Sequence, residues 1–170
     1  EVSKGHAKST IGGNLAVLKE NGLLINTAGE RVVNERSSNK AILKVLLAQD
    51  PQMLYLLLDA KHFDIFSDEV AEGGITHEDL ARWMTQKGAA TPKAFKGRTL
   101  EELAAQAQMP LENLRETITR FNQWVVQKED KEFNRPAEFL QVPIGEGPYY
   151  LIEQKPRFAT TMGGLVVNEQ

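Results

Sequence analysis

Short apolar runs alternate along the chain with stretches whose hydrophobic residues recur every three or four positions. The longest run covers residues 53–59 and is typical of a central strand that is buried on both faces. Two shorter runs, 23–26 and 31–33, flank a glycine-containing turn and predict a β-hairpin. Residues 149–153 and 164–168 predict two further strands.

The stretches with helical periodicity predict four helices, and capping signals mark where they begin. Ser37 or Ser38 is expected to cap the first helix, while Thr76 and Thr99 each open a capping sequence. The predicted helices cover residues 41–49, 76–88, 99–106 and 110–128, and residues 63–74 and 129–148 are expected to be irregular. The pattern therefore predicts an α+β fold in which helices pack on a small mixed or antiparallel sheet.

The composition is ordinary for one globular domain and excludes several kinds of chemistry. The chain has 170 residues, of which 41% are hydrophobic and 25% charged, and its net charge of −3 offers no basic surface for nucleic acid. No apolar run approaches the ~18 residues of a membrane-spanning helix, so we expect no membrane insertion. Because the chain contains no cysteine, disulfides, thiolate catalysis and cysteine-bound zinc are excluded.

The remaining polar groups do not form a recognisable catalytic or metal site. Three histidines lack ligand spacing to one another, so no metal is expected; they are His6, His62 and His77. Of these, His62 is expected to be structural or at the surface. The carboxylate pairs 101–102 and 129–130 are expected to be charges at helix ends. The chain has no Gly-x-Gly-x-x-Gly turn, so by itself it shows no means of holding a dinucleotide.

Several motifs, taken in order, resemble the fumarate reductase/succinate dehydrogenase-like flavoproteins. Residues Gly147–Tyr150 and Pro156–Leu165 resemble the segment through which those chains leave a capping (clamp) domain and return to the FAD domain. The hairpin that ends in Asn34-Glu35 resembles another motif of the family. The matching stretches are 21–35, 99–104, 114–122, 130–136, 147–150 and 156–165. The order and spacing of these motifs are closest to the soluble flavocytochrome-type fumarate reductase branch.

This resemblance implies a capping-domain-like fold and a cut within a larger bacterial protein. Residues 1–20 are then the segment that comes from an FAD-binding domain, 21–160 the capping domain, and 161–170 the start of the return to the FAD-binding domain. The expected cofactor is FAD, bound mainly outside this chain. The expected partners are that FAD-binding domain and a small organic acid. Relatives of this kind occur on both sides of the bacterial inner membrane, which leaves cytoplasm and periplasm open.

The resemblance also implies where a proton donor should lie. In fumarate reductases of this type, hydride comes from the flavin and a proton comes from an arginine of the capping domain. The position of that arginine falls on Asn39, whose amide has no ionisable proton. The catalytic residue is therefore unknown, with Arg36 and Lys40 as the neighbouring candidates.

Two further groups of positions follow from the same resemblance. The substrate-clamping histidine of the family falls on Thr160, so Thr160, Thr161 and Asn39 are candidates for substrate binding. Met162, Gly163 and Gly164 are candidates for contact with the cofactor, because glycine permits close approach of the backbone.

We therefore expect the capping domain of an FAD-dependent oxidoreductase, inactive as an isolated fragment. It would close over the flavin and help bind an unsaturated organic acid other than fumarate, since the matched positions lack the charge that a dicarboxylate requires. Two other classes stay open at this point. One is a stand-alone domain that binds a small ligand, and the other is a structural or oligomerisation domain without catalysis.

Overall fold

A four-stranded antiparallel sheet organises the part of the chain that the structure describes. The computed structural model describes residues 20–72, 74, 76–86 and 93–154. The strands are β1 (Leu23–Ile25), β2 (Leu54–Leu58), β3 (Ala94–Gly97) and β4 (Tyr149–Gln154). Their order in the sheet is β1-β2-β4-β3, and every neighbouring pair is antiparallel. The α+β class predicted from the sequence is confirmed.

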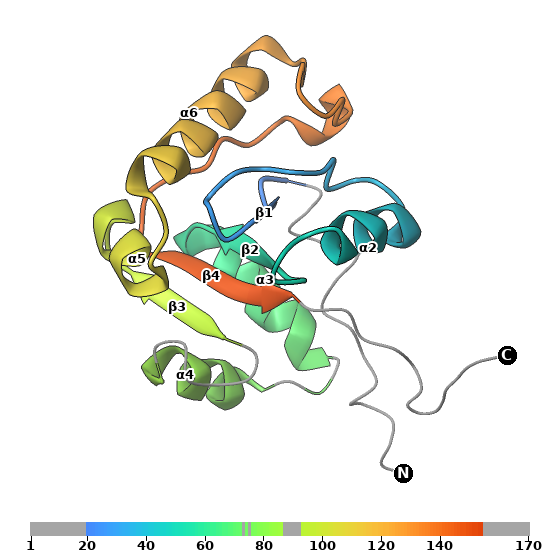
Figure 1. The fold of residues 1–170 in the computed structure, drawn as a ribbon. Helices are drawn as coiled ribbons and strands as arrows, with labels where there is room; N and C mark the ends of the chain where they lie inside the picture. Colours follow the sequence, from blue (N-terminus) through green and yellow to red (C-terminus); the bar gives the residue numbers. More distant parts are fainter. Residues whose placement is uncertain (1–19, 73, 75, 87–92, 155–170) are drawn as a thin grey trace, which may run out of the picture.

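Helices cover both faces of this sheet, which lies between them (Figure 1). The helices are α2 (Asn39–Leu47), α3 (Ala60–Glu72), α4 (His77–Thr85), α5 (Leu100–Ala107), α6 (Leu111–Gln127) and the 3-10 turn η2 (Ala137–Phe139). Alternate strand residues point to opposite faces, so Leu57 and Leu151 pack with α5 and α6, while Leu56 and Ile152 pack with α2, α3 and α4. Two hydrophobic cores result.

Several elements agree with the sequence pattern. The run at 53–59 forms the central strand β2, in which all five residues are buried. Ser38, rather than Ser37, caps α2, because its side chain accepts the backbone N–H of Ala41. The capping box at Thr76 is complete, and the side chain of Thr99 likewise accepts the N–H of Glu102. The irregular segment predicted at 129–148 contains only the turn η2.

Three predictions need correction. Residues 63–74 were expected to be irregular, yet α3 extends over Ala60–Glu72; the Asp59 carboxylate caps its first turn by accepting the N–H of His62 at 2.9 Å. The hairpin at 23–33 is reduced to one bridge between Ile25 and Arg31. Strand β3 was not predicted, because four residues containing lysine and glycine carry little β signal. The predicted strand at 164–168 and the expected helix end near Gly88 lie outside the described residues.

Leu56 provides a test of the central strand. Its side chain is fully buried and its backbone neighbours are Leu24 and Ile152. We expect Leu56→Ala to lower the free energy of unfolding by about 2–5 kcal/mol, because it leaves a cavity in the core. Urea unfolding of the chain measures this loss. Val126→Ala, at a side chain that is 81% exposed, should change the same quantity by less than about 0.5 kcal/mol.

Candidate functional site

The segment that leads into α2 contains the sequence-predicted candidates Arg36, Asn39 and Lys40. Its backbone is tightly turned. The Asn34 side-chain oxygen accepts the N–H of Arg36 at 2.8 Å, and the Asn34 carbonyl accepts the N–H of Ser37 at 2.9 Å. The candidates therefore lie on a defined turn and on the first turn of a helix.

Glu35 fixes this segment to the sheet. Its carboxylate is fully buried and accepts two hydrogen bonds from the guanidinium of Arg31, at 2.9 and 2.7 Å. It also accepts the backbone N–H of Leu24 on the edge strand β1, at 3.2 Å, and Nη1 of Arg135, at 3.2 Å. Because one carboxylate satisfies a strand and two arginines, the position of the following residues is strongly constrained.

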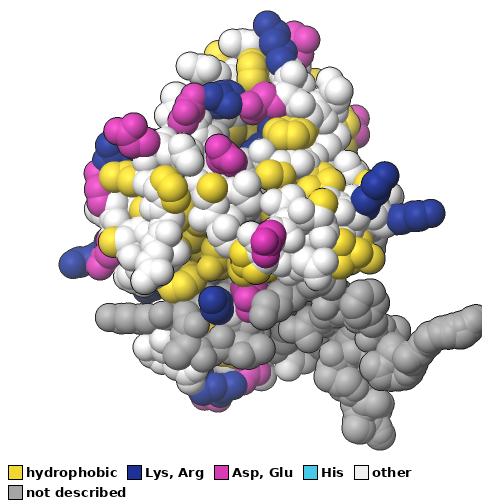
Figure 2. All heavy atoms as spheres, in the orientation of Figure 1, with side chains coloured by type: hydrophobic (Ala, Val, Ile, Leu, Met, Phe, Trp, Pro, Cys, Tyr) yellow, Lys and Arg dark blue, Asp and Glu magenta, His cyan; other side chains and the backbone are white. Residues whose placement is uncertain are grey.

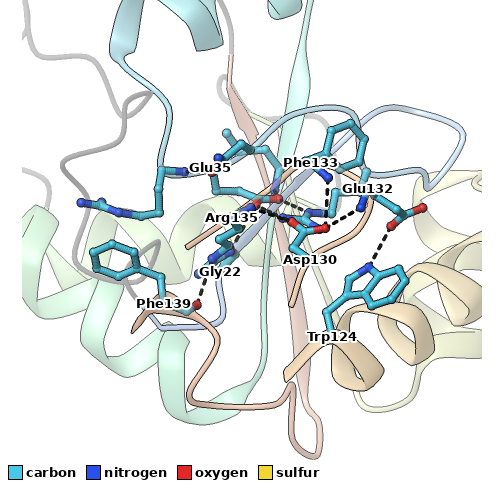
Figure 3. Close-up of polar contacts among 12 residues, drawn as sticks. Gly22, Glu35, Trp124, Asp130, Glu132, Phe133, Arg135 and Phe139 are labelled. Carbon is cyan, nitrogen blue, oxygen red and sulfur yellow. Dashed lines mark hydrogen bonds and ion pairs between the residues drawn. The ribbon is translucent and has the colours of Figure 1, made fainter. Parts of the chain in front are cut away.

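Arg135 ties together parts of the chain that are far apart in sequence (Figure 3). Its guanidinium donates to the carbonyl oxygens of Gly22 at 3.1 Å, Glu20 at 3.0 Å and Phe139 at 3.0 Å. The Arg135 side chain itself is fully buried. The guanidinium thus joins residues 20–22 to the loop after α6.

Asp130 completes what we call the ion network, which consists of Arg31, Glu35, Asp130 and Arg135. The Asp130 carboxylate lies 2.8 Å from Nη2 of Arg31. It also accepts the backbone N–H groups of Glu132, Phe133 and Arg135 at 2.9, 3.0 and 3.1 Å, which closes the turn after α6. The network contains two cations and two anions and is electrically balanced.

Burial and ion pairing shift the pKa values of the network residues in opposite directions. Burial opposes the charge of Arg31, but Glu35 and Asp130 raise its pKa above the usual value. Burial also opposes the charge of Asp130, yet Arg31 keeps the pKa of that carboxyl below its usual value. For Arg135, burial prevails and lowers the pKa despite the attraction of Glu35. These shifts keep Arg31 and Asp130 charged near neutral pH.

Aromatic rings enclose the two arginines. The Arg31 guanidinium lies 5.5 Å from the ring centre of Phe121 and 5.1 Å from that of Phe133, and Arg135 lies 5.2 Å from Phe121. These cation–π contacts contribute more where water is excluded. They also fix the planes of the guanidinium groups.

The candidates differ in their surroundings. Arg36 is half-buried, with its guanidinium 4.4 Å from the ring centre of Phe139 in η2. Lys40 is exposed. Asn39 is the first residue of α2. The other candidates, Thr160, Thr161, Met162, Gly163 and Gly164, lie outside the described residues.

Asp130 differs from its prediction, whereas the burial of His62 is compatible with the structural role expected for it. Asp130, expected to be a helix-end charge, is buried in the ion network. His62 is also buried, between Asp59 at 2.8 Å and Glu20 at 2.6 Å. Sequence reasoning found neither cluster, because nothing in a linear pattern shows that Glu35 and Arg135, a hundred residues apart, meet. A usable signal was that Glu35 and Asp130 both lie in motifs that carry the family resemblance.

The described residues do not provide a cradle for a dinucleotide. Their strands pair only antiparallel, so they contain no strand–glycine turn–helix unit of the kind that receives a pyrophosphate. No glycine lines the hollow of about 240 Å³ beside Arg31 or the hollow of about 650 Å³ between α3, α4 and β3. FAD does not fit these residues by themselves.

The described part of the chain also shows no metal-binding group and no membrane-spanning helix. It contains no group of three side chains suited to a metal ion, and none of its helices is long and apolar enough to cross a membrane. On the face shown in Figure 2, acidic and basic side chains are interspersed rather than gathered by sign. That face therefore has no extended basic surface for nucleic acid.

Comparison with known proteins supplies the family. A family model described as an FAD binding domain matches residues 7–170. The chain belongs to this FAD binding domain family. The match indicates FAD as the cofactor, and the similar proteins are fumarate reductase-like flavoproteins, as the sequence motifs suggested.

A similar protein and a similar solved structure show how much of the chain is matched. The urocanate reductase of Eggerthella lenta is 27% identical over 157 residues, which covers 89% of this chain and 23% of the relative. A solution NMR structure of the fumarate reductase flavoprotein subunit from Lactobacillus plantarum matches with a TM-score of 0.75 and 25% identity, covering 93% of this chain and 97% of that one.

An open conformation of a flavocytochrome c3 fumarate reductase matches with a TM-score of 0.67 and 20% identity. This match covers 86% of the chain and 24% of that structure, and at this identity it concerns the fold alone. The chain thus spans less than a quarter of the urocanate reductase and of the flavocytochrome chain.

Removing Arg135 tests the ion network. We expect Arg135→Met to lower the free energy of unfolding by about 3–5 kcal/mol, because it leaves the buried carboxylate of Glu35 with one partner fewer. Chemical denaturation measures the loss. The matched control is Arg115→Met, since Arg115 pairs with Glu101 on the surface and should contribute about 0–1 kcal/mol. Equal effects of the two substitutions would contradict the network's role.

Asp130 should also make the stability of the domain depend on acid pH. Its pKa is lower in the folded state than in the unfolded chain, so its contribution is present above about pH 4 and is lost as pH falls through the folded value. We expect unfolding free energies measured between pH 7 and pH 3 to fall less steeply in Asp130→Asn than in the wild type. An unchanged slope would show that Asp130 does not carry this dependence.

Proposed function

We propose that the chain is the capping domain of an FAD-dependent oxidoreductase of the fumarate reductase type. Its assigned parts are residues 1–20 from the FAD-binding domain, 21–160 as the cap, and 161–170 as the start of the return. The observation that carries this proposal is a combination of two facts. The chain belongs to an FAD binding family, yet its described residues offer no cradle for a dinucleotide.

The role of a cap agrees with the coverage of the similar proteins. A piece that spans less than a quarter of two longer flavoproteins is of the size of one domain within them. One of these longer structures is described as an open conformation, which implies that it also closes. A cap that closes over a cofactor site excludes water and completes the arrangement of groups around the substrate.

The redox chemistry belongs to FAD, and this chain's residues orient the substrate. The turn at 34–38 and the start of α2 hold Arg36 and Lys40 near Asn39, with the helix N-terminus adding a partial positive charge. Substrate carboxylates are bound by cations and N–H donors of this kind. The ion network below the turn keeps these groups in place, as efficient catalysis requires.

The substrate that we propose is an unsaturated organic acid other than fumarate. Asn39 has no ionisable proton, and Thr160 has no charge with which to clamp a second carboxylate. A monocarboxylate requires less positive charge than a dicarboxylate. The similar proteins include a urocanate reductase and an NADH:acrylate oxidoreductase, which agrees with a family whose members differ in substrate.

The parent protein provides the test. It is reduced without oxygen, and its flavin absorbance is followed after addition of fumarate, acrylate or urocanate. We expect slow or no reoxidation by fumarate and faster reoxidation by one of the other acids. Arg36→Gln should raise KM for that acid by about tenfold, equivalent to ~1.4 kcal/mol of lost carboxylate binding.

Each outcome has a separate meaning. Arg115→Gln removes an exposed arginine on α6 and should leave the KM unchanged. Rapid reoxidation by fumarate would exclude the proposed substrate class but keep the enzyme class. A parent protein without flavin would contradict the whole proposal. If Arg36→Gln behaves as the wild type does, Arg36 does not bind the substrate.

A further inference from the structure

A second buried polar cluster is centred on the first turn of α3 and shares Glu20 with the contacts of the ion network. Its centre is His62 on the first turn of α3, whose side chain is 1% exposed. Nδ1 of the imidazole lies 2.8 Å from Oδ1 of Asp59, and Nε2 lies 2.6 Å from Oε1 of Glu20. Both ring nitrogens therefore face a carboxylate oxygen at hydrogen-bond distance.

This geometry selects one protonation state of the ring. A neutral imidazole has one N–H, so it can donate to only one of the two carboxylates and turns a lone pair toward the other. The imidazolium has two N–H groups and satisfies both. With both carboxylates ionised, the contacts at both nitrogens are satisfied together only by the protonated ring.

The two carboxylates are not held equally well. Asp59 also accepts the backbone N–H of His62 at 2.9 Å, the amide of Asn21 at 3.0 Å and the N–H of Gly145 at 2.8 Å. The Glu20 side chain is 44% exposed, and His62 is the partner that the structure gives its carboxylate. When the ring loses a proton, Asp59 keeps three donors and Glu20 is the group that leaves.

Glu20 lies at the start of the domain. Its backbone carbonyl is held by Arg135 of the ion network, and its side chain is held by His62. We propose that protonated His62 anchors the point where the chain enters the domain, and that loss of its proton to solvent frees the carboxylate of Glu20 and loosens that point. Any effect of this loosening on the closure of a cap rests on the proposed function, whereas the anchor itself does not.

The charged surroundings of His62 set the direction of the pH response. Glu20 and Asp59, the residue after β2, face the ring, and the charges of Asp59 and Glu146 both act on Tyr149. Burial disfavours the imidazolium, but hydrogen bonds to Asp59 and Glu20 raise the pKa of His62 above its usual value. The anchor is thus complete below about pH 6.5 and is lost as pH rises through the folded value.

Nuclear magnetic resonance of the labelled 170-residue chain tests the anchor directly. Ring nitrogen shifts of His62 are recorded between pH 5 and pH 9, together with the backbone amides of Glu20 and Asn21. We expect both ring nitrogens to be protonated at pH 6, and the two amides to titrate with the same midpoint as the ring. The order parameter of the Glu20 amide should fall above that midpoint.

Two acid-to-amide substitutions separate the anchor from a general effect of charge. Glu20→Gln should lower the His62 midpoint by about one pH unit and remove the change in the Glu20 order parameter. Asp68→Asn is the matched control, because Asp68 faces the exposed His77 at 3.1 Å, and it should leave the His62 midpoint unchanged.

Three results would overturn the inference: a neutral His62 ring at pH 6, a Glu20 amide that does not follow the ring, or a His62 midpoint that is the same in Glu20→Gln. None of them depends on flavin or substrate. A failure of this titration therefore leaves the proposed function intact, and a parent protein without flavin leaves the anchor intact.

Discussion

The pairing of Arg31 and Arg135 with Glu35 and Asp130 is the interaction on which the irregular half of this structure depends. Strand β1 has three residues, and the chain after α6 contains only one 3-10 turn before β4 among its described residues. Neither segment has enough sheet or helix hydrogen bonds to define its own course. The buried charges fix the course of both segments, because a buried charge without a partner has a large desolvation cost.

Such a network contributes more to specificity than to net stability. Two guanidinium groups and two carboxylates lose their hydration on burial, and their mutual attraction offsets that loss only in one arrangement. A hydrophobic replacement would tolerate many arrangements of the turn at 34–38. The charged version admits the one in which Glu35 reaches β1, Arg31 and Arg135 together. The start of α2, which follows this turn directly, is fixed by the same contacts.

Local patterns in the sequence were sufficient wherever the structure is locally determined. The apolar run of β2, the stripe of α6 and the caps at Ser38 and Thr76 each depend on neighbours within a few residues. The features that the sequence did not predict have a weak local pattern or depend on residues that are far apart in the chain. Helix α3 has a polar outer face that hid its periodicity, β3 is defined by its pairing with β4, and the ion network joins residues a hundred positions apart. The candidate residues were predicted from the family resemblance, and the local turn and cap hydrogen bonds explain only the positions of their backbone.

The two polar clusters meet at one residue, and this has a mechanical meaning. Arg135 holds the backbone carbonyl of Glu20, and His62 holds its carboxylate, so the first described residue is attached both to the loop after α6 and to the first turn of α3. Those two elements lie on opposite faces of the sheet. A force transmitted through the chain at Glu20 is therefore passed to both layers at once. Glu20 is thus held to both layers, and the turn at 34–38 is held by the same ion network through Glu35.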